Sequence, residues 1–187
     1  MKTKFLGLLL SIPLLLVACD EGFSLDDSDL NLISVDSESS INLSLYPDNV
    51  ANGTVSVNVF EESMRLIDGI TPSLDKINAL QKRLNENTLL RTDSEFKAEF
   101  VSAIEDYQIF IKGLYPSPST EADFEINKSF SEILYYSELL GQSLRDYTGS
   151  YEIHHRADAN KYAQSIKTSY IVFIDKLDKY KLFTDSE

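Results

Sequence analysis

Apolar residues recur at intervals of three and four along the C-terminal two thirds of the chain. This spacing places them on one face of a helix and predicts amphipathic helices. The expected helices span residues 58–84, 92–114, 120–149 and 157–180. Because the connections between them are short, neighbouring helices are expected to run antiparallel. The pattern therefore predicts an all-α fold, an antiparallel bundle of about four helices.

The first expected helix has a gap in its apolar stripe, and this gap contains Gly69 and Pro72. Proline inside a helix removes a hydrogen bond and crowds the preceding turn, but it is well tolerated at the first helical position. Two alternatives follow. Either the helix continues with a kink near Gly69 and Pro72, or it ends there and a second helix begins at Pro72 with Thr71 as its N-cap.

Between residues 41 and 59 the apolar positions alternate with polar ones. Ile41 to Leu45 and Val55 to Val59 both show this period of two, and the segment between them is rich in turn formers. Alternation of this kind is typical of a strand, so a small β-hairpin is expected. An isolated two-stranded hairpin is marginal in water, so an extended linker stays open as the alternative.

The first residues of the chain have the form of a secretory signal. Lys2 and Lys4 precede an apolar run from Phe5 to Val17. A helix of that length spans about 20 Å, which is short of the roughly 30 Å hydrocarbon core of a bilayer. A cleaved signal is therefore favoured over a permanent transmembrane helix.

The run ends in Leu16-Val17-Ala18-Cys19, which resembles the lipobox of bacterial lipoproteins. The resemblance implies cleavage before Cys19, diacylglycerol on its sulfur and an acyl chain on the new amino group. A bilayer is then the first expected partner, because several acyl chains together make attachment effectively permanent. The alternative is an ordinary signal peptide that carries a cysteine near its end.

Asp20 and Glu21 follow the cysteine directly. An acidic pair at this position resembles the signal that retains enterobacterial lipoproteins in the inner membrane. The resemblance favours a lipid-anchored protein of the cell envelope, held in the inner membrane and facing the periplasm. An outer-membrane or surface location stays open.

Charge is distributed unevenly along the chain. The net charge is −13, and Asp20 to Ser63 contains acidic residues but no lysine or arginine. This acidity argues against nucleic acid as a partner, because phosphate recognition requires clustered basic residues. The expected organisation is a signal peptide over residues 1–18, a lipidated acidic tether over residues 19–57 and a helical domain over residues 58–187.

No catalytic motif is assembled in the sequence. Ser73 and Lys76 have the Ser-x-x-Lys spacing, but the other motifs of that enzyme class do not occur. His154 and His155, with Glu152 and Asp158, could supply metal ligands. Adjacent histidines are expected to point in different directions, however, so a polar loop is the favoured interpretation. The sequence thus predicts no enzyme, no metal site and no cofactor beyond the lipid on Cys19.

Tyrosines are concentrated in the last two expected helices. The hypothesis is that Tyr135, Tyr136, Tyr147 and Tyr151 contribute to a partner-binding surface, where tyrosine is enriched. The alternative is that these rings lie at the edge of the core with their hydroxyls in water. The expected function is that of an envelope lipoprotein whose helical domain binds another envelope protein. A helical bundle that binds a small ligand between its helices is the second hypothesis.

Overall fold

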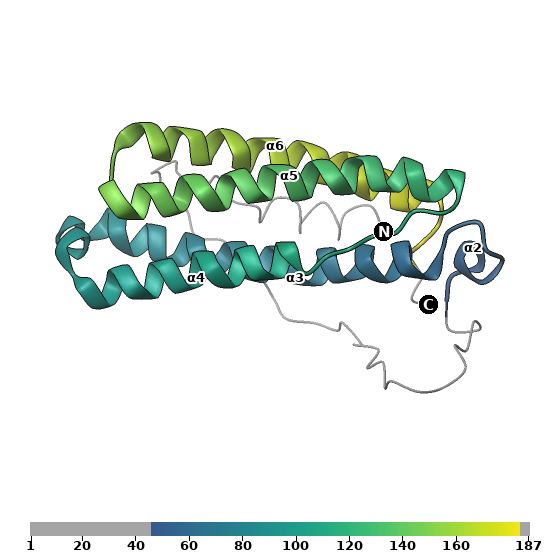
Figure 1. The fold of residues 1–187 in the computed structure, drawn as a ribbon, viewed down its shortest axis with the longest axis horizontal. Helices are drawn as coiled ribbons and strands as arrows, with labels where there is room; N and C mark the ends of the chain where they lie inside the picture. Colours follow the sequence, from purple (N-terminus) through teal and green to yellow (C-terminus); the bar gives the residue numbers. More distant parts are fainter. Residues whose placement is uncertain (1–45, 184–187) are drawn as a thin grey trace.

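The computed structural model describes residues 46–183, which form a bundle of four long helices (Figure 1). The long helices are α3 (Val57–Glu86), α4 (Ser94–Lys112), α5 (Glu121–Ser150) and α6 (Ile153–Lys179). A short helix, α2 (Asp48–Ala51), precedes them, and a 3-10 helix, η2 (Thr88–Thr92), connects α3 to α4. Residues 46–183 contain no strand. The all-α bundle predicted from the apolar spacing is confirmed.

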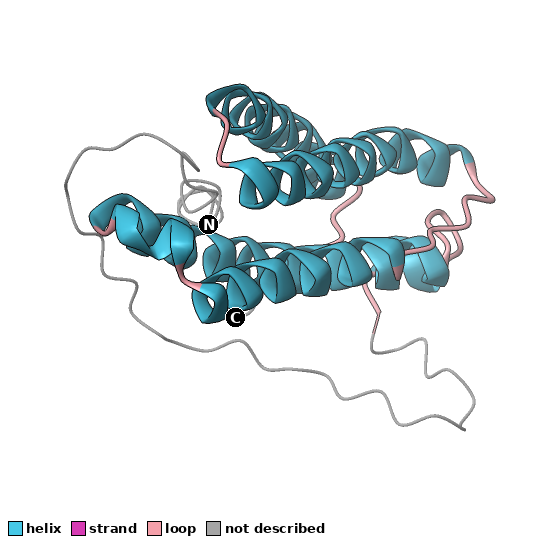
Figure 2. Ribbon diagram, turned by 60° about the vertical axis from the view of Figure 1, so that its left-hand side comes forward, coloured by secondary structure: helices cyan, strands magenta, loops and turns pink. Residues whose placement is uncertain are grey.

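The long helices lie alongside one another in two layers (Figures 1 and 2). One layer is the antiparallel pair α3 and α4, and the other is the antiparallel pair α5 and α6. The layers meet mainly where α4 packs against α5. The chain crosses between the layers once, through residues 113–120. Helices connected in sequence are thus neighbours in space, as short connections require.

Helix α3 is one continuous element of 30 residues, with Pro72 inside it. Of the two alternatives for this region, the one in which a second helix begins at Pro72 is therefore wrong. Pro72 lies on the exposed side of α3, where water can hydrate the carbonyl that loses its hydrogen bond. Ile70 and Leu74, on either side of it, are both buried in the core and hold the helix together across the proline. Gly69 has a packing role, because a Cβ atom there would lie 2.3 Å from the Phe110 ring of α4.

Residues 46–59 form neither the expected hairpin nor an extended linker. They contain α2, a turn and the first residues of α3. The alternating pattern misleads because Val50 and Val55 are buried against the end of the bundle, whereas Val57 and Val59 already belong to α3. The Ser56 hydroxyl caps α3 by accepting a hydrogen bond from the Val59 N–H at 3.3 Å. The first half of the expected hairpin, residues 41–45, lies outside the described residues.

The core follows the apolar stripes read from the sequence. Aromatic rings of the neighbouring helices α5 and α6 meet inside it, with the Phe130 and Phe173 centroids 5.7 Å apart in an edge-to-face arrangement. The largest fully buried side chains come from all four long helices, and they are Tyr107, Tyr170, Phe100, Phe130, Phe173, Leu66, Ile70, Leu74, Ile77, Leu84, Ile104 and Ile126. The bundle is therefore held by one continuous apolar interior.

One buried carboxylate organises the end of the bundle at which the chain crosses between the layers. Asp123, in the first turn of α5, is fully buried. Its Oδ1 accepts a hydrogen bond from the Ser56 N–H at 2.9 Å, and its Oδ2 accepts from the N–H groups of Ser119 and Thr120 at 2.9 and 3.0 Å. The Thr120 hydroxyl in turn accepts from the Asp123 N–H at 3.1 Å, which completes a capping box. A single side chain thus connects the start of α3 to the start of α5.

Further hydrogen bonds from α3 fix the same crossover. Glu62 accepts from the Tyr115 N–H at 3.0 Å through Oε2 and from Arg65 at 2.6 Å through Oε1. Asn58 accepts from the Ser117 N–H at 2.6 Å. We call these two segments, residues 56–62 at the start of α3 and residues 113–123, together the proximal clasp. It satisfies backbone N–H groups that a loop pressed against a helix would otherwise leave without partners.

Asp123 is predicted to make the largest single polar contribution to stability. Burial opposes its ionisation, but the N–H groups of Ser119, Ser56 and Thr120 outweigh burial and lower the pKa of the carboxyl group below its ordinary value. Asp123→Ala is expected to lower the free energy of unfolding in urea by about 3 kcal/mol at neutral pH. A control, Glu138→Ala on the exposed side of α5, is expected to change it by less than about 0.5 kcal/mol.

The same carboxylate gives the stability a defined pH dependence. Its folded pKa is lowered, so its contribution is complete above the unfolded value of about 3.9 and is lost as the pH falls through the folded pKa. Asp123→Asn should therefore flatten the fall of stability between about pH 5 and pH 2. Equal acid sensitivity in the two proteins would contradict this assignment.

Candidate functional site

The two ends of the bundle differ in character. The proximal end carries α2, the proximal clasp and Tyr46, the first described residue (Figure 1). The opposite end consists of η2 and the turn between α5 and α6. We call residues 88–92 and 150–155 the distal tip. Its two segments are in contact, because the Arg91 guanidinium lies 5.8 Å from the centroid of the Tyr151 ring.

The local conformation at the distal tip is set by Tyr151. This residue adopts a left-handed conformation, with φ of 56° and ψ of 25°, and ends α5. Its ring packs edge-to-face on Tyr147, with centroids 5.5 Å apart. This ring contact helps to stabilise the left-handed backbone conformation of Tyr151. Glu152 follows in an extended conformation and is the N-cap of α6. The chain thus reverses direction within two residues.

The distal tip carries two strongly exposed apolar side chains. Ile153 is 83% exposed and Leu89 is 77% exposed, the highest values among the large apolar side chains of the described residues. Neither belongs to a helical stripe, and the sequence analysis did not single them out. The signal that could have found them is an apolar residue inside a polar inter-helix segment. Single exposed apolar side chains are common on protein surfaces, so these two mark a candidate contact because they share one end of the bundle.

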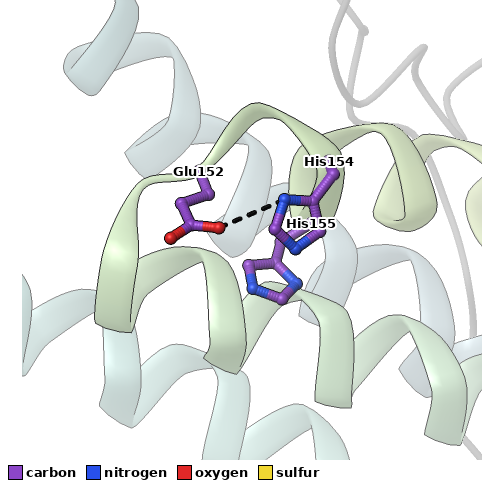
Figure 3. Close-up of side chains that lie close together, drawn as sticks. All are labelled: Glu152, His154 and His155. Carbon is purple, nitrogen blue, oxygen red and sulfur yellow. Dashed lines mark ion pairs between the residues drawn. The ribbon is translucent and has the colours of Figure 1, made fainter.

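Three side chains with metal-ligating atoms also meet at the distal tip (Figure 3). Glu152 and His154 are exposed, and the Nδ1 atom of His154 lies 3.2 Å from Oε2 of Glu152. The rings of His154 and His155 have centroids only 3.9 Å apart. The expectation that adjacent histidines point in different directions is therefore wrong here. Asp158, the fourth residue considered, is not part of this cluster.

The four tyrosines of the expected partner surface do not form one patch. Tyr147 is only 2% exposed and belongs to the core, so its assignment to a surface is wrong. Tyr151 is partly buried against it. Tyr135 is 59% exposed near the middle of α5, where its ring packs on the neighbouring Tyr136 at 5.3 Å. Of these four tyrosines, only Tyr135 is mainly exposed, and Tyr136 and Tyr151 are half-buried.

Ser73 and Lys76, which have the Ser-x-x-Lys spacing, form hydrogen bonds with other residues and not with each other. The Ser73 hydroxyl donates to the Gly69 carbonyl at 2.8 Å, while Lys76 pairs with Asp106 of α4 at 2.8 Å. Burial raises the pKa of Tyr107 and Tyr170 well above the ordinary value, so both phenols stay protonated at neutral pH. None of these groups forms a nucleophile and base pair.

Open hollows lie between neighbouring helices on the surface of the described residues. One of about 260 Å³ between α4 and α5 is lined by Glu105, Gln108, Ile109, Lys112 and Arg145. Another of about 490 Å³ between α5 and α6 is lined by Glu132, Tyr136, Lys161, Gln164, Ser165, Thr168 and Ser169. Both are open to solvent, and most of their lining residues carry polar or charged groups. A small ligand, as the second hypothesis requires, would gain little burial in either, because both hollows are open.

The residues of the expected anchor, Cys19, Asp20 and Glu21, lie outside the described residues. Within residues 46–183, none of the helices combines the length and the apolar character needed to cross a bilayer. The candidate functional site that the described residues offer is therefore the distal tip.

The burial of Tyr147 and the exposure of Tyr135 predict opposite effects of truncation. Tyr147→Ala removes a packed ring from the core and is expected to cost about 3–5 kcal/mol of unfolding free energy. Tyr135→Ala removes one exposed ring contact and should cost about 1 kcal/mol or less. Urea denaturation of both variants measures the difference. Equal losses would contradict the distinction between core and surface tyrosines.

Comparison of the chain with protein-family models, with curated proteins and with solved structures finds no match.

Proposed function

We propose that this protein is a lipid-anchored protein of the bacterial cell envelope whose helical bundle binds another envelope protein through the distal tip. In this proposal residues 1–18 are a signal peptide and Cys19 carries the lipid. Asp20 and Glu21 retain the protein in the inner membrane, facing the periplasm. The helical domain is an interaction module and not an enzyme.

The single observation that carries the proposal is the contrast between the two ends of the bundle. The chain enters the bundle at the proximal end, where Asp123 and Glu62 hold the crossover by hydrogen bonds. At the other end, Ile153 and Leu89 are more exposed than any other large apolar side chain of the described residues. An attached protein with this polarity presents its two most exposed apolar side chains away from its anchor, while the exposed Tyr115 ring lies on the anchored side.

The dimensions agree with such a role. Helix α3 has 30 residues and is about 45 Å long. Residues 19–45, between the proposed lipid and the first described residue, could span up to about 90 Å if fully extended. The acidic character of this segment would keep it away from anionic headgroups. The distal tip could thus reach a partner tens of ångströms from the bilayer surface.

The expected complex is transient. A contact confined to one end of a four-helix bundle buries less than about 1,200 Å² in total, the size typical of weak signalling or accessory complexes. The apolar anchors would be Leu89 and Ile153, and the exposed Arg91 guanidinium of the distal tip, which lies over the Tyr151 ring, would be available to a carboxylate of the partner. Crosslinking is therefore a more suitable measurement than copurification.

The lipid anchor is tested by labelling cells with an alkyne fatty acid. The natural chain should incorporate the label and lose residues 1–18, whereas Cys19→Ala should incorporate none and keep those residues. Ser24→Ala, five residues further along, is the matched control and should behave like the natural chain. A natural chain that stays unlabelled would refute the lipoprotein assignment.

The distal tip is tested by photo-crosslinking in cells, with benzoylphenylalanine placed at one position at a time. Probes at Leu89 and Ile153 should both capture the same protein. A probe at Phe124, an exposed apolar residue near the proximal end of α5, is the matched control and should not capture it.

Specificity is checked by a second substitution in the same chain. Leu89→Asp should reduce capture from a probe at Ile153 by at least about tenfold, because it places a charge in the proposed apolar contact. Capture from Phe124 alone, or capture from Ile153 that is unaffected by Leu89→Asp, would count against the tip as the binding surface.

A further inference from the structure

The turn between α5 and α6 brings together two imidazoles and a carboxylate (Figure 3). One ligand atom from each of Glu152, His154 and His155 lies within 4.8 Å of the others. We infer that these three side chains form a surface site for a divalent transition-metal ion. The inference rests on this geometry alone and does not depend on the lipid anchor or on a partner.

The distances fit a small ion after minor rotation of side chains. The Nδ1 atom of His154 and Oε2 of Glu152 are 3.2 Å apart. Two ligand atoms bound to a tetrahedral zinc ion at about 2.0–2.1 Å are separated by about 3.3 Å. The His155 ring lies next to that of His154, with centroids 3.9 Å apart. Because Glu152 and His154 are exposed, both can adjust to the ion without disturbing the core.

The backbone holds the three residues in this relation. Tyr151, in its left-handed conformation, ends α5, so Glu152 is the N-cap of α6 and the histidines lie in the first turn of that helix. An N-cap side chain ordinarily accepts a hydrogen bond from the backbone of that turn. The Glu152 side chain makes no such bond and is directed at His154 instead. The carboxylate is thus available to a ligand.

The donor set selects the kind of metal. Imidazole nitrogen favours zinc, copper or nickel, while magnesium and calcium prefer sites made of oxygen ligands. Three protein ligands leave at least one coordination position for water or for a donor from another molecule. With three ligands, of which Glu152 and His154 are exposed and His155 is half-buried, binding is expected to be weaker than at four-ligand structural zinc sites, with a Kd of about 1 μM or above.

The test is calorimetric titration of the full chain with zinc chloride, in detergent and without a polyhistidine tag. All proteins carry Cys19→Ser, so that the single thiol of the chain cannot compete for zinc. One zinc ion per chain is expected. His154→Ala and His155→Ala should each weaken binding at least about tenfold, and Glu152→Gln should weaken it severalfold. Magnesium should not bind at this site.

Asp158→Asn is the matched control, an exposed acid on α6 that lies outside the cluster, and it should leave zinc binding unchanged. Thermal melting of each variant checks that the bundle stays folded. The chain contains two histidines, both in this cluster, so zinc should shift the ring ¹⁵N resonances of both. Absence of zinc binding, or binding that survives removal of both histidines, would overturn the inference and leave the cluster an ion pair only.

Discussion

The buried carboxylate of Asp123 is the interaction on which the arrangement of the bundle depends. It accepts hydrogen bonds from Ser56 at the start of α3 and from Ser119 and Thr120 at the start of α5. Hydrogen bonds to a charged group contribute about 1.5–3 kcal/mol each, and together they offset the cost of removing the carboxylate from water. Because the only crossover between the two described layers ends at this residue, the same bonds fix how the α3–α4 pair meets the α5–α6 pair.

This constraint gives the molecule two unlike ends. Backbone groups at the proximal end are satisfied by side chains of α3, and α2 closes that end further through the hydrogen bond from Asn49 to the Tyr180 carbonyl at 2.8 Å. The distal tip has no comparable closure among the described residues. It combines exposed Leu89 and Ile153 with a cluster of imidazoles and a carboxylate. In the proposed lipoprotein, the two most exposed apolar side chains lie at the end away from the anchor, where a partner can contact them.

The fold could be predicted from the sequence because helical periodicity is local and strong, but contacts between distant residues could not. Pro72 indicated a break, yet it faces solvent while its apolar neighbours continue into the core. Val55, Val57 and Val59 alternate with polar residues as in a strand, although Ser56 caps α3 there and the last two valines belong to that helix. Tyrosine is a residue type that is enriched at interfaces, but the Tyr147 ring lies in the core and packs on Tyr151. The left-handed Tyr151 sets the start of α6 and so places Glu152 beside the histidines, which periodicity does not reveal.

Amide hydrogen exchange measures the contrast between the two ends directly. The amide protons of Ser56, Ser119 and Thr120 donate to a buried carboxylate, so they should exchange as slowly as those of the core turns of α5. Amides of η2, which contains no buried residue, should exchange through local opening and much faster. Fast exchange at Ser56, Ser119 and Thr120, equal to that of η2, would contradict the account of an Asp123-centred clasp at one end and an open tip at the other.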